Sequence, residues 1–108
     1  MNDRLPSGVL ASALVRRAHD AGGSAMILAK GDPQGGALMV VVADPGGEER
    51  LLERRIDLDG RPTLIDSTPA DDLPGYWRRR RERDPDLWVI ELIVPGAERL
   101  VAETIASN

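Results

Sequence analysis

The sequence contains no cysteine, one histidine and one lysine among its 108 residues. Without cysteine the chain can form no disulfide, no thiolate metal site and no cysteine nucleophile, which fits a cytoplasmic protein. No segment reaches the roughly 18 apolar residues typical of a membrane-spanning helix, and the N-terminal segment lacks the basic start of a signal peptide. We therefore expect a cytoplasmic protein that does not enter a membrane.

The composition is typical of a globular protein, with 42% hydrophobic and 30% charged residues. A chain of this length supports one hydrophobic core, which predicts a single domain over residues 1–108. The formal net charge of −4 opposes long-range attraction to a polyanion such as nucleic acid.

The spacing of apolar residues predicts a first helix that begins with Ser7 as its N-cap and stops before two glycines. Segments 24–30 and 37–43 are apolar on both faces and flank a Gly-Asp-Pro-Gln-Gly-Gly turn. They predict a hairpin whose strands are covered on both faces or lie at the centre of the sheet. Segments 50–57 and 61–67 mix polar and apolar residues, and they predict a second, more exposed hairpin at a sheet edge.

A second helix is expected after a loop, with Asp71 or Asp72 as its N-cap. Segment 87–94 is apolar on both faces and predicts a strand at the centre of the sheet. Segment 97–106 is compatible with a helix or with a returning strand. The order of elements predicts an α+β fold, with a mostly antiparallel sheet of about five strands and two helices packed mainly on one face.

Residues 77–88 place five arginines between two tryptophans. Arginines that neutralise phosphates and a tryptophan that stacks on a base are the components of a single-strand nucleic-acid site. However, a helix turns by about 100° per residue, so the arginines surround it instead of forming one stripe. Arg78 with Glu82, and Arg80 with Asp84, stand four residues apart and are expected to pair. This pattern favours a solvated, self-paired helix over a nucleic-acid site.

Side chains alternate between the two faces of the strand predicted at 87–94, and Glu91 falls on a face that is otherwise apolar. A buried carboxylate must be paired or it destabilises the fold. Arg16 or Arg17 is the expected partner if the first helix covers this face. Such a pair is more often structural than catalytic.

No metal site or cofactor site is predicted. Asp32, Asp84, Asp86 and Glu91 could offer oxygen ligands to a hard cation, but no further metal-site pattern accompanies them and the single histidine has no second histidine to complete a site. Segment 30–36 does not lead into a helix, as a phosphate-binding loop does.

Three segments carry a resemblance to a known family: "ALVRRAHDAGG" (13–23), "AKGDPQGGALMVVV" (29–42) and "RDPDLWVIEL" (83–92). Together they resemble a bacterial family of domains of unknown function, the one numbered fourteen ninety-one. The resemblance implies a small cytoplasmic protein, and it implies no activity and no catalytic residue.

The expected function is a small cytoplasmic binding or protein-interaction module without catalysis, whose partner is another protein or a second copy. The candidate partner-binding residues are Trp77, Arg78, Arg79 and Arg81. One alternative is a nucleic-acid-associated protein that uses the helix at 78–83, and another is an enzyme built around Glu91 and Asp86. A homodimer is favoured, because strand 87–94 needs a neighbour on its second edge if the tail is helical.

Overall fold

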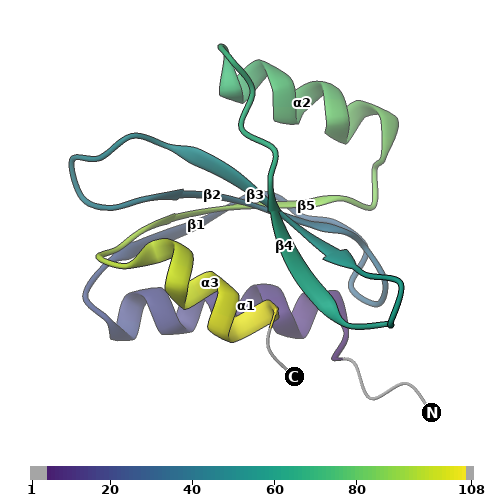
Figure 1. Ribbon diagram of the computed structural model, residues 1–108, viewed down its shortest axis with the longest axis horizontal. Coiled ribbons are helices and arrows are strands. Elements are labelled where there is room, and N and C mark those ends of the chain that lie inside the picture. The colour runs from purple at the N-terminus through teal and green to yellow at the C-terminus, as the bar shows by residue number, and fades with distance from the viewer. Residues whose placement is uncertain (1–4, 107–108) are drawn as a thin grey trace.

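The computed structural model describes residues 5–106. The elements in chain order are α1 (Ser7–Asp20), β1 (Ser24–Ala29), β2 (Leu38–Ala43), β3 (Arg50–Ile56), β4 (Pro62–Asp66), α2 (Leu73–Arg83), β5 (Trp88–Ile93) and α3 (Ala97–Ile105). The five strands form one sheet, with α1 and α3 on one face and α2 on the other (Figure 1). No helix within the described range is long and apolar enough to cross a membrane.

The expected α+β class is confirmed, with two corrections. The sheet is mixed, because β2 and β5 are parallel while the other neighbouring strands are antiparallel. The tail folds as a third helix, α3, so two helices cover one face and one covers the other. A sheet whose central strands are apolar on both faces needs helices on both faces, which explains the second correction.

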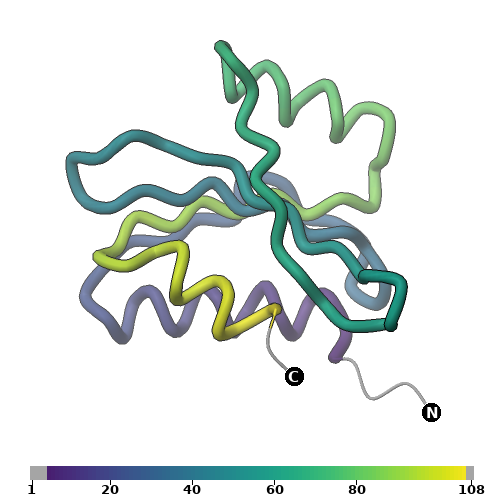
Figure 2. The backbone as a smooth tube through the Cα atoms, in the orientation of Figure 1, coloured from purple at the N-terminus to yellow at the C-terminus, as the bar shows by residue number. Residues whose placement is uncertain are grey.

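The strand β5 lies between β1 and β2, in the order β1-β5-β2-β3-β4. Its central position confirms the prediction for segment 87–94. The expected hairpin of segments 24–30 and 37–43 is wrong, because these two strands pair with β5 instead of with each other. In Figure 2 the light green trace of β5 runs between the blue traces of β1 and β2. Both edges of β5 are therefore occupied within the chain, which removes the reason for expecting a homodimer through this strand.

The connection between β1 and β2 wraps around the start of β5. The Asp32 amide donates to the Asp86 carbonyl at 3.0 Å, and the Trp88 amide donates to the Ala37 carbonyl at 2.8 Å. The indole Nε1 of Trp88 donates to the Asp32 carbonyl at 2.8 Å. A Cβ added at Gly36 would collide with the Asp86 carbonyl oxygen. The glycine-rich segment thus accommodates the inserted strand and does not form a tight hairpin turn.

The two edges of the sheet are β1 and β4. The second predicted hairpin is confirmed, because β3 and β4 are antiparallel neighbours and β4 lies at an edge. The expectation that β1 is covered on both faces is wrong. As an edge strand it leaves Met26 60% exposed and Ile27 43% exposed.

The starts of α1 and α2 are held in different ways. Pro6 occupies the N-cap of α1 in place of the predicted Ser7. Ser7 is buried in the first turn, where its hydroxyl donates to the Gly36 carbonyl at 2.6 Å. Asp72, one of the two predicted caps of α2, accepts a hydrogen bond from the Gly75 amide at 3.1 Å.

The apolar interior has two layers. The larger cluster lies between the sheet and α1 with α3, and the smaller lies between the sheet and α2. α2 has no fully buried residue, and it contacts the smaller cluster through Leu73, Tyr76 and Trp77. The candidate site lies in this smaller cluster, between α2 and the sheet.

Candidate functional site

A buried polar network holds α2 to the sheet. Glu53 of β3 is only 5% exposed, and Arg80 of α2 contacts both of its carboxylate oxygens, from Nη1 at 2.9 Å and from Nη2 at 3.0 Å. Ser67 donates to the same carboxylate at 2.7 Å, and Arg80 also donates to the Tyr76 hydroxyl oxygen at 2.9 Å. Hydrogen bonds from Arg80 lower the pKa of Glu53, and the same carboxylate raises the pKa of Arg80.

The expected pairing of charges along α2 is wrong. Arg80 pairs with Glu53 on the sheet instead of with Asp84. The guanidinium of Arg78 stacks over the Trp77 ring, 5.3 Å from its centroid. Within residues 5–106, no ion pair joins Arg78 to Glu82. The helix therefore presents cations that its own carboxylates do not neutralise.

The two sides of α2 face different strands. Arg80 reaches Glu53 on β3, whereas Arg81 donates from Nη2 to the carbonyl of Lys30, just after β1, at 2.9 Å. Residues three apart lie on the same side of a helix, so Arg78 lies on the side of Arg81. α2 therefore presents its Arg78 and Arg81 side above β1.

A cavity of about 180 Å³ opens under the first half of α2. Its lining residues come from the sheet, from the loop just before β3 and from the helix: Leu28, Val41, Glu49, Leu73, Pro74, Trp77, Arg78 and Glu91. The structure thus brings together Trp77, Arg78 and Glu91, which sequence analysis had selected separately. The other two predicted binding residues lie outside the lining, with Arg79 exposed and Arg81 bonded near β1.

Glu91 is partly buried on the α2 face of β5, where its strand neighbours are Met26 and Val41. The structure does not form the pair expected with Arg16 or Arg17, because α1 covers the opposite face. Arg17 instead donates to Thr104 Oγ1 at 2.8 Å and pairs with Glu103 at 3.3 Å; Arg16 is exposed. In the described part of the chain, no side-chain partner holds the Glu91 carboxylate.

Asp86 does not join Glu91 at the cavity. Its side chain is exposed and its carbonyl accepts from the Asp32 amide. Between residues 5 and 106, no three His, Asp or Glu side chains are grouped so as to hold a metal ion together.

Comparison with known proteins identifies the family. Residues 5–102 match the family described as "Protein of unknown function (DUF1491)". The chain belongs to the DUF1491 family. This confirms the family resemblance found in the sequence.

Solved structures of similar chains share the fold. A crystal structure of a DUF1491 family protein from Caulobacter crescentus CB15 is 32% identical, with a TM-score of 0.76, and the match covers 83% of this chain and 88% of that one. An NMR structure of a DUF1491 family protein from the same organism is 34% identical, with a TM-score of 0.72 and coverages of 83% and 86%. The solution structure of protein Atu0922 from A. tumefaciens is 27% identical, with a TM-score of 0.70 and coverages of 84% and 86%. No curated protein matches the chain.

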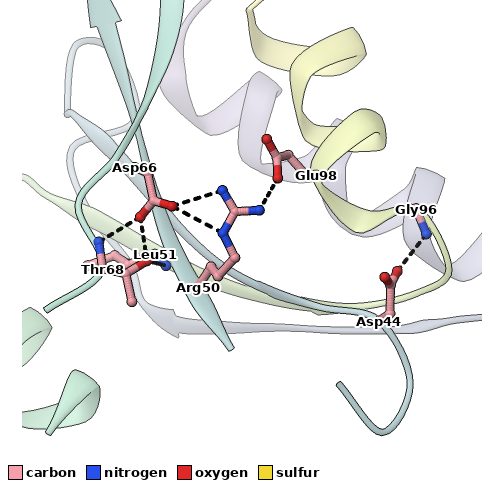
Figure 3. A network of polar contacts seen from close by, with 7 residues as sticks. All are labelled: Asp44, Arg50, Leu51, Asp66, Thr68, Gly96 and Glu98. Atoms are coloured by element: carbon pink, nitrogen blue, oxygen red, sulfur yellow. Dashed lines mark hydrogen bonds and ion pairs between the residues drawn. The ribbon is translucent and has the colours of Figure 1, made fainter. Parts of the chain in front are cut away.

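This DUF1491 chain has a second polar cluster, shown in Figure 3, on the α3 side. Arg50 donates to Asp66 at 2.8 and 3.1 Å and also bonds Glu98 of α3. Hydrogen bonds from Thr68, together with those from Arg50, lower the pKa of Asp66 to about 2. The polar side chains drawn there bond with other parts of the fold, and Leu51 and Gly96 take part through their backbone amides, so we assign these contacts to stability.

The Glu53–Arg80 network of the DUF1491 chain was not predicted from the sequence. Its two main members are 27 residues apart, and Glu53 lies in a segment, Arg-Leu-Leu-Glu-Arg-Arg, that looks like an exposed strand. The one available signal was the stripe of apolar residues on α2, which places Arg80 on the buried side.

Proposed function

We propose that this protein is a small cytoplasmic binding module without catalytic activity, and that it binds an extended segment of a protein partner along the edge of β1. The observation that carries this proposal is the exposure of Met26 and Ile27, at 60% and 43%, on a strand whose second edge has no neighbour among the described elements.

A free strand edge offers unpaired backbone amides and carbonyls to another chain. Addition of an extended peptide to such an edge is a recurring mode of recognition, in which main-chain hydrogen bonds provide affinity and pockets provide specificity. Met26 lies on the α2 face beside Glu91, and Ile27 lies opposite Ile90 on the α1 face. A bound strand could therefore pack apolar side chains on both faces of the extended sheet.

The cavity under α2 adjoins this edge. Leu28 of β1 forms part of its lining, together with Trp77 and Arg78. A partner strand next to β1 would place alternate side chains toward this cavity, because side chains alternate between the two faces of a sheet. The combination of a free edge with an adjacent cavity favours binding over catalysis.

The proposal is tested by replacing both exposed apolar residues with charge, in a Met26→Lys/Ile27→Lys protein. Lysines on an edge strand oppose strand addition, so we expect loss of the proteins that crosslink to the native chain in the source cell. The matched control is Leu58→Lys, because Leu58 is fully exposed in the turn between β3 and β4. An unchanged set of crosslinked proteins in the double variant would contradict the proposal.

Light scattering separates the two kinds of partner. A second copy bound edge to edge would give a dimer mass that the Met26→Lys/Ile27→Lys substitutions reduce to the monomer mass. A monomer mass for the native chain would exclude a second copy as the partner.

A further inference from the structure

We propose that the segment bound along β1 is acidic, and that Arg78 and Arg81 of α2 recognise its carboxylates. This inference rests on the proposed edge binding and adds the chemical class of the partner. The observation that supports it is the positive charge on the side of α2 that lies above β1.

Three cations gather at this rim. Arg78 lines the cavity beside Leu28 of β1, Arg81 donates to the Lys30 carbonyl, and Lys30 itself follows the last residue of β1. No ion pair engages Arg78, Arg81 or Lys30 within residues 5–106. Arg78 shares its cavity with Glu49 and Glu91 but forms no ion pair with either. A guanidinium without an ion pair is available to a carboxylate, which it binds with two parallel hydrogen bonds.

Arg81 is positioned by its own contacts. Its Nη2 is fixed on the Lys30 carbonyl at 2.9 Å, and its Nε is buried without a hydrogen-bond partner among the described residues. Because Nε is buried, a carboxylate of the bound segment would meet the accessible part of the partly buried Arg81 side chain and not Nε. The carboxylates of Glu91 and Glu49 line the cavity below the helix, and they repel an acidic side chain that goes deeper than the rim.

A peptide fits these observations better than single-stranded nucleic acid does. Nucleic acid of this kind is bound on exposed aromatic faces together with a positively charged groove. Here the Trp77 ring is covered by Arg78, and the cavity beneath it contains two glutamates.

The test selects random peptides of about a dozen residues, displayed on phage, against the purified chain. We expect the selected peptides to alternate apolar residues with aspartate or glutamate, and to bind about five- to tenfold more weakly to an Arg78→Gln/Arg81→Gln protein. Because Arg81 also supports the fold, Arg78→Gln alone is measured as well and is expected to weaken binding in the same direction. The melting temperature of each variant checks its folding.

The matched control removes the same charge from the other side of the helix. Arg79 and Arg83 stand four residues apart, share the side away from Arg78 and are exposed. An Arg79→Gln/Arg83→Gln protein should keep the affinity for the selected peptides within about twofold.

The outcomes distinguish this inference from the proposed function. The selected peptides could lack acidic residues and still lose binding in Met26→Lys/Ile27→Lys. That result would overturn the inference and leave edge binding intact. No enriched peptide, or peptides insensitive to those edge substitutions, would overturn both. Affinity is also measured for an oligothymidylate. If it binds as tightly as the acidic peptides, and with the same dependence on Arg78, the inference is overturned in favour of nucleic acid.

Discussion

At the scale of single residues, Glu53 is the carboxylate on which the position of α2 depends. It is buried, and it is tolerated because Arg80 and Ser67 together supply three hydrogen bonds to its two oxygens. Removing one member of a buried pair leaves the other without compensation. The network therefore fixes α2 at one position above the sheet.

Replacing Glu53 by glutamine should lower the free energy of unfolding by about 2–4 kcal/mol. The value is at the lower end for a buried pair because the Arg80 side chain is 31% exposed and keeps some contact with water. Urea denaturation measures the change. The control Glu82→Gln removes an exposed carboxylate from the same helix and should change stability by less than about 0.5 kcal/mol; equal effects of the two substitutions would contradict the role of Glu53.

Asp66 should make stability depend on pH in the acid range. Hydrogen bonds from Thr68 and Arg50 lower its pKa from 3.8 to about 2, and hydrogen bonds from Arg80 lower the pKa of Glu53 in the same direction. A carboxyl group with a lowered folded-state pKa contributes stability that is present above its unfolded pKa and is lost as pH falls through its folded pKa.

We therefore expect the free energy of unfolding to decline as pH falls from about 4 to 2, and the decline to be smaller in Asp66→Asn. Urea denaturation repeated across this range measures it. Identical pH profiles for the native chain and the variant would contradict the assignment.

The residues of the candidate site were only partly predictable. Trp77 and Arg78 were selected because of their residue types. Asp72 was one of the two caps predicted for α2, because capping depends on neighbouring residues alone. The partner of Arg80 depends on which strand lies beneath α2, and the environment of Glu91 depends on which helix covers its face. Both are decided by the topology of the sheet, which local sequence does not contain.

At the scale of elements, the insertion of β5 between β1 and β2 decides the topology. The central strand was predictable because segment 87–94 is apolar on both faces. Its neighbours were not, because a Gly-Asp-Pro sequence between two apolar segments is equally typical of a hairpin turn. What distinguishes this connection is its close approach to Asp86 and Trp88, more than 50 residues later in the chain.

Gly36 should therefore be intolerant of a side chain. A Cβ at this position meets the Asp86 carbonyl oxygen, so Gly36→Ala should destabilise the fold by about 1–3 kcal/mol. The matched control is Gly35→Ala, whose Cβ would have Asp32 Oδ2 as its nearest neighbour at 3.9 Å. Thermal unfolding of both variants measures the difference, and equal melting temperatures would contradict the packing argument.

At the scale of the whole molecule, stability is expected to be uneven. Every residue of β2 is buried, and most of β5 is buried, whereas α2 has no fully buried residue. Segments with few buried contacts open at lower free energy than the core. The face that contains the candidate site is thus the less stable face.

Hydrogen exchange should show this difference directly. We expect the slowest amide exchange in β2 and β5, and exchange through local opening in α2. In the Glu53→Gln protein, exchange in α2 should accelerate more than exchange in β2. Uniform acceleration across the chain would instead indicate that α2 opens only when the whole protein unfolds.

Because β5 lies between β1 and β2, the sheet can be completed only after β5 has been synthesised. A ribosome releases β1 and β2 first, and the strand that joins them in the sheet begins only at Trp88, after β3, β4 and α2 have been made. Contacts between distant parts of a sequence form slowly, since the intervening chain must first be ordered. The nascent protein therefore holds β1 and β2 without their shared neighbour until β5 emerges. During that interval apolar strand edges are open to incorrect pairing or to a chaperone.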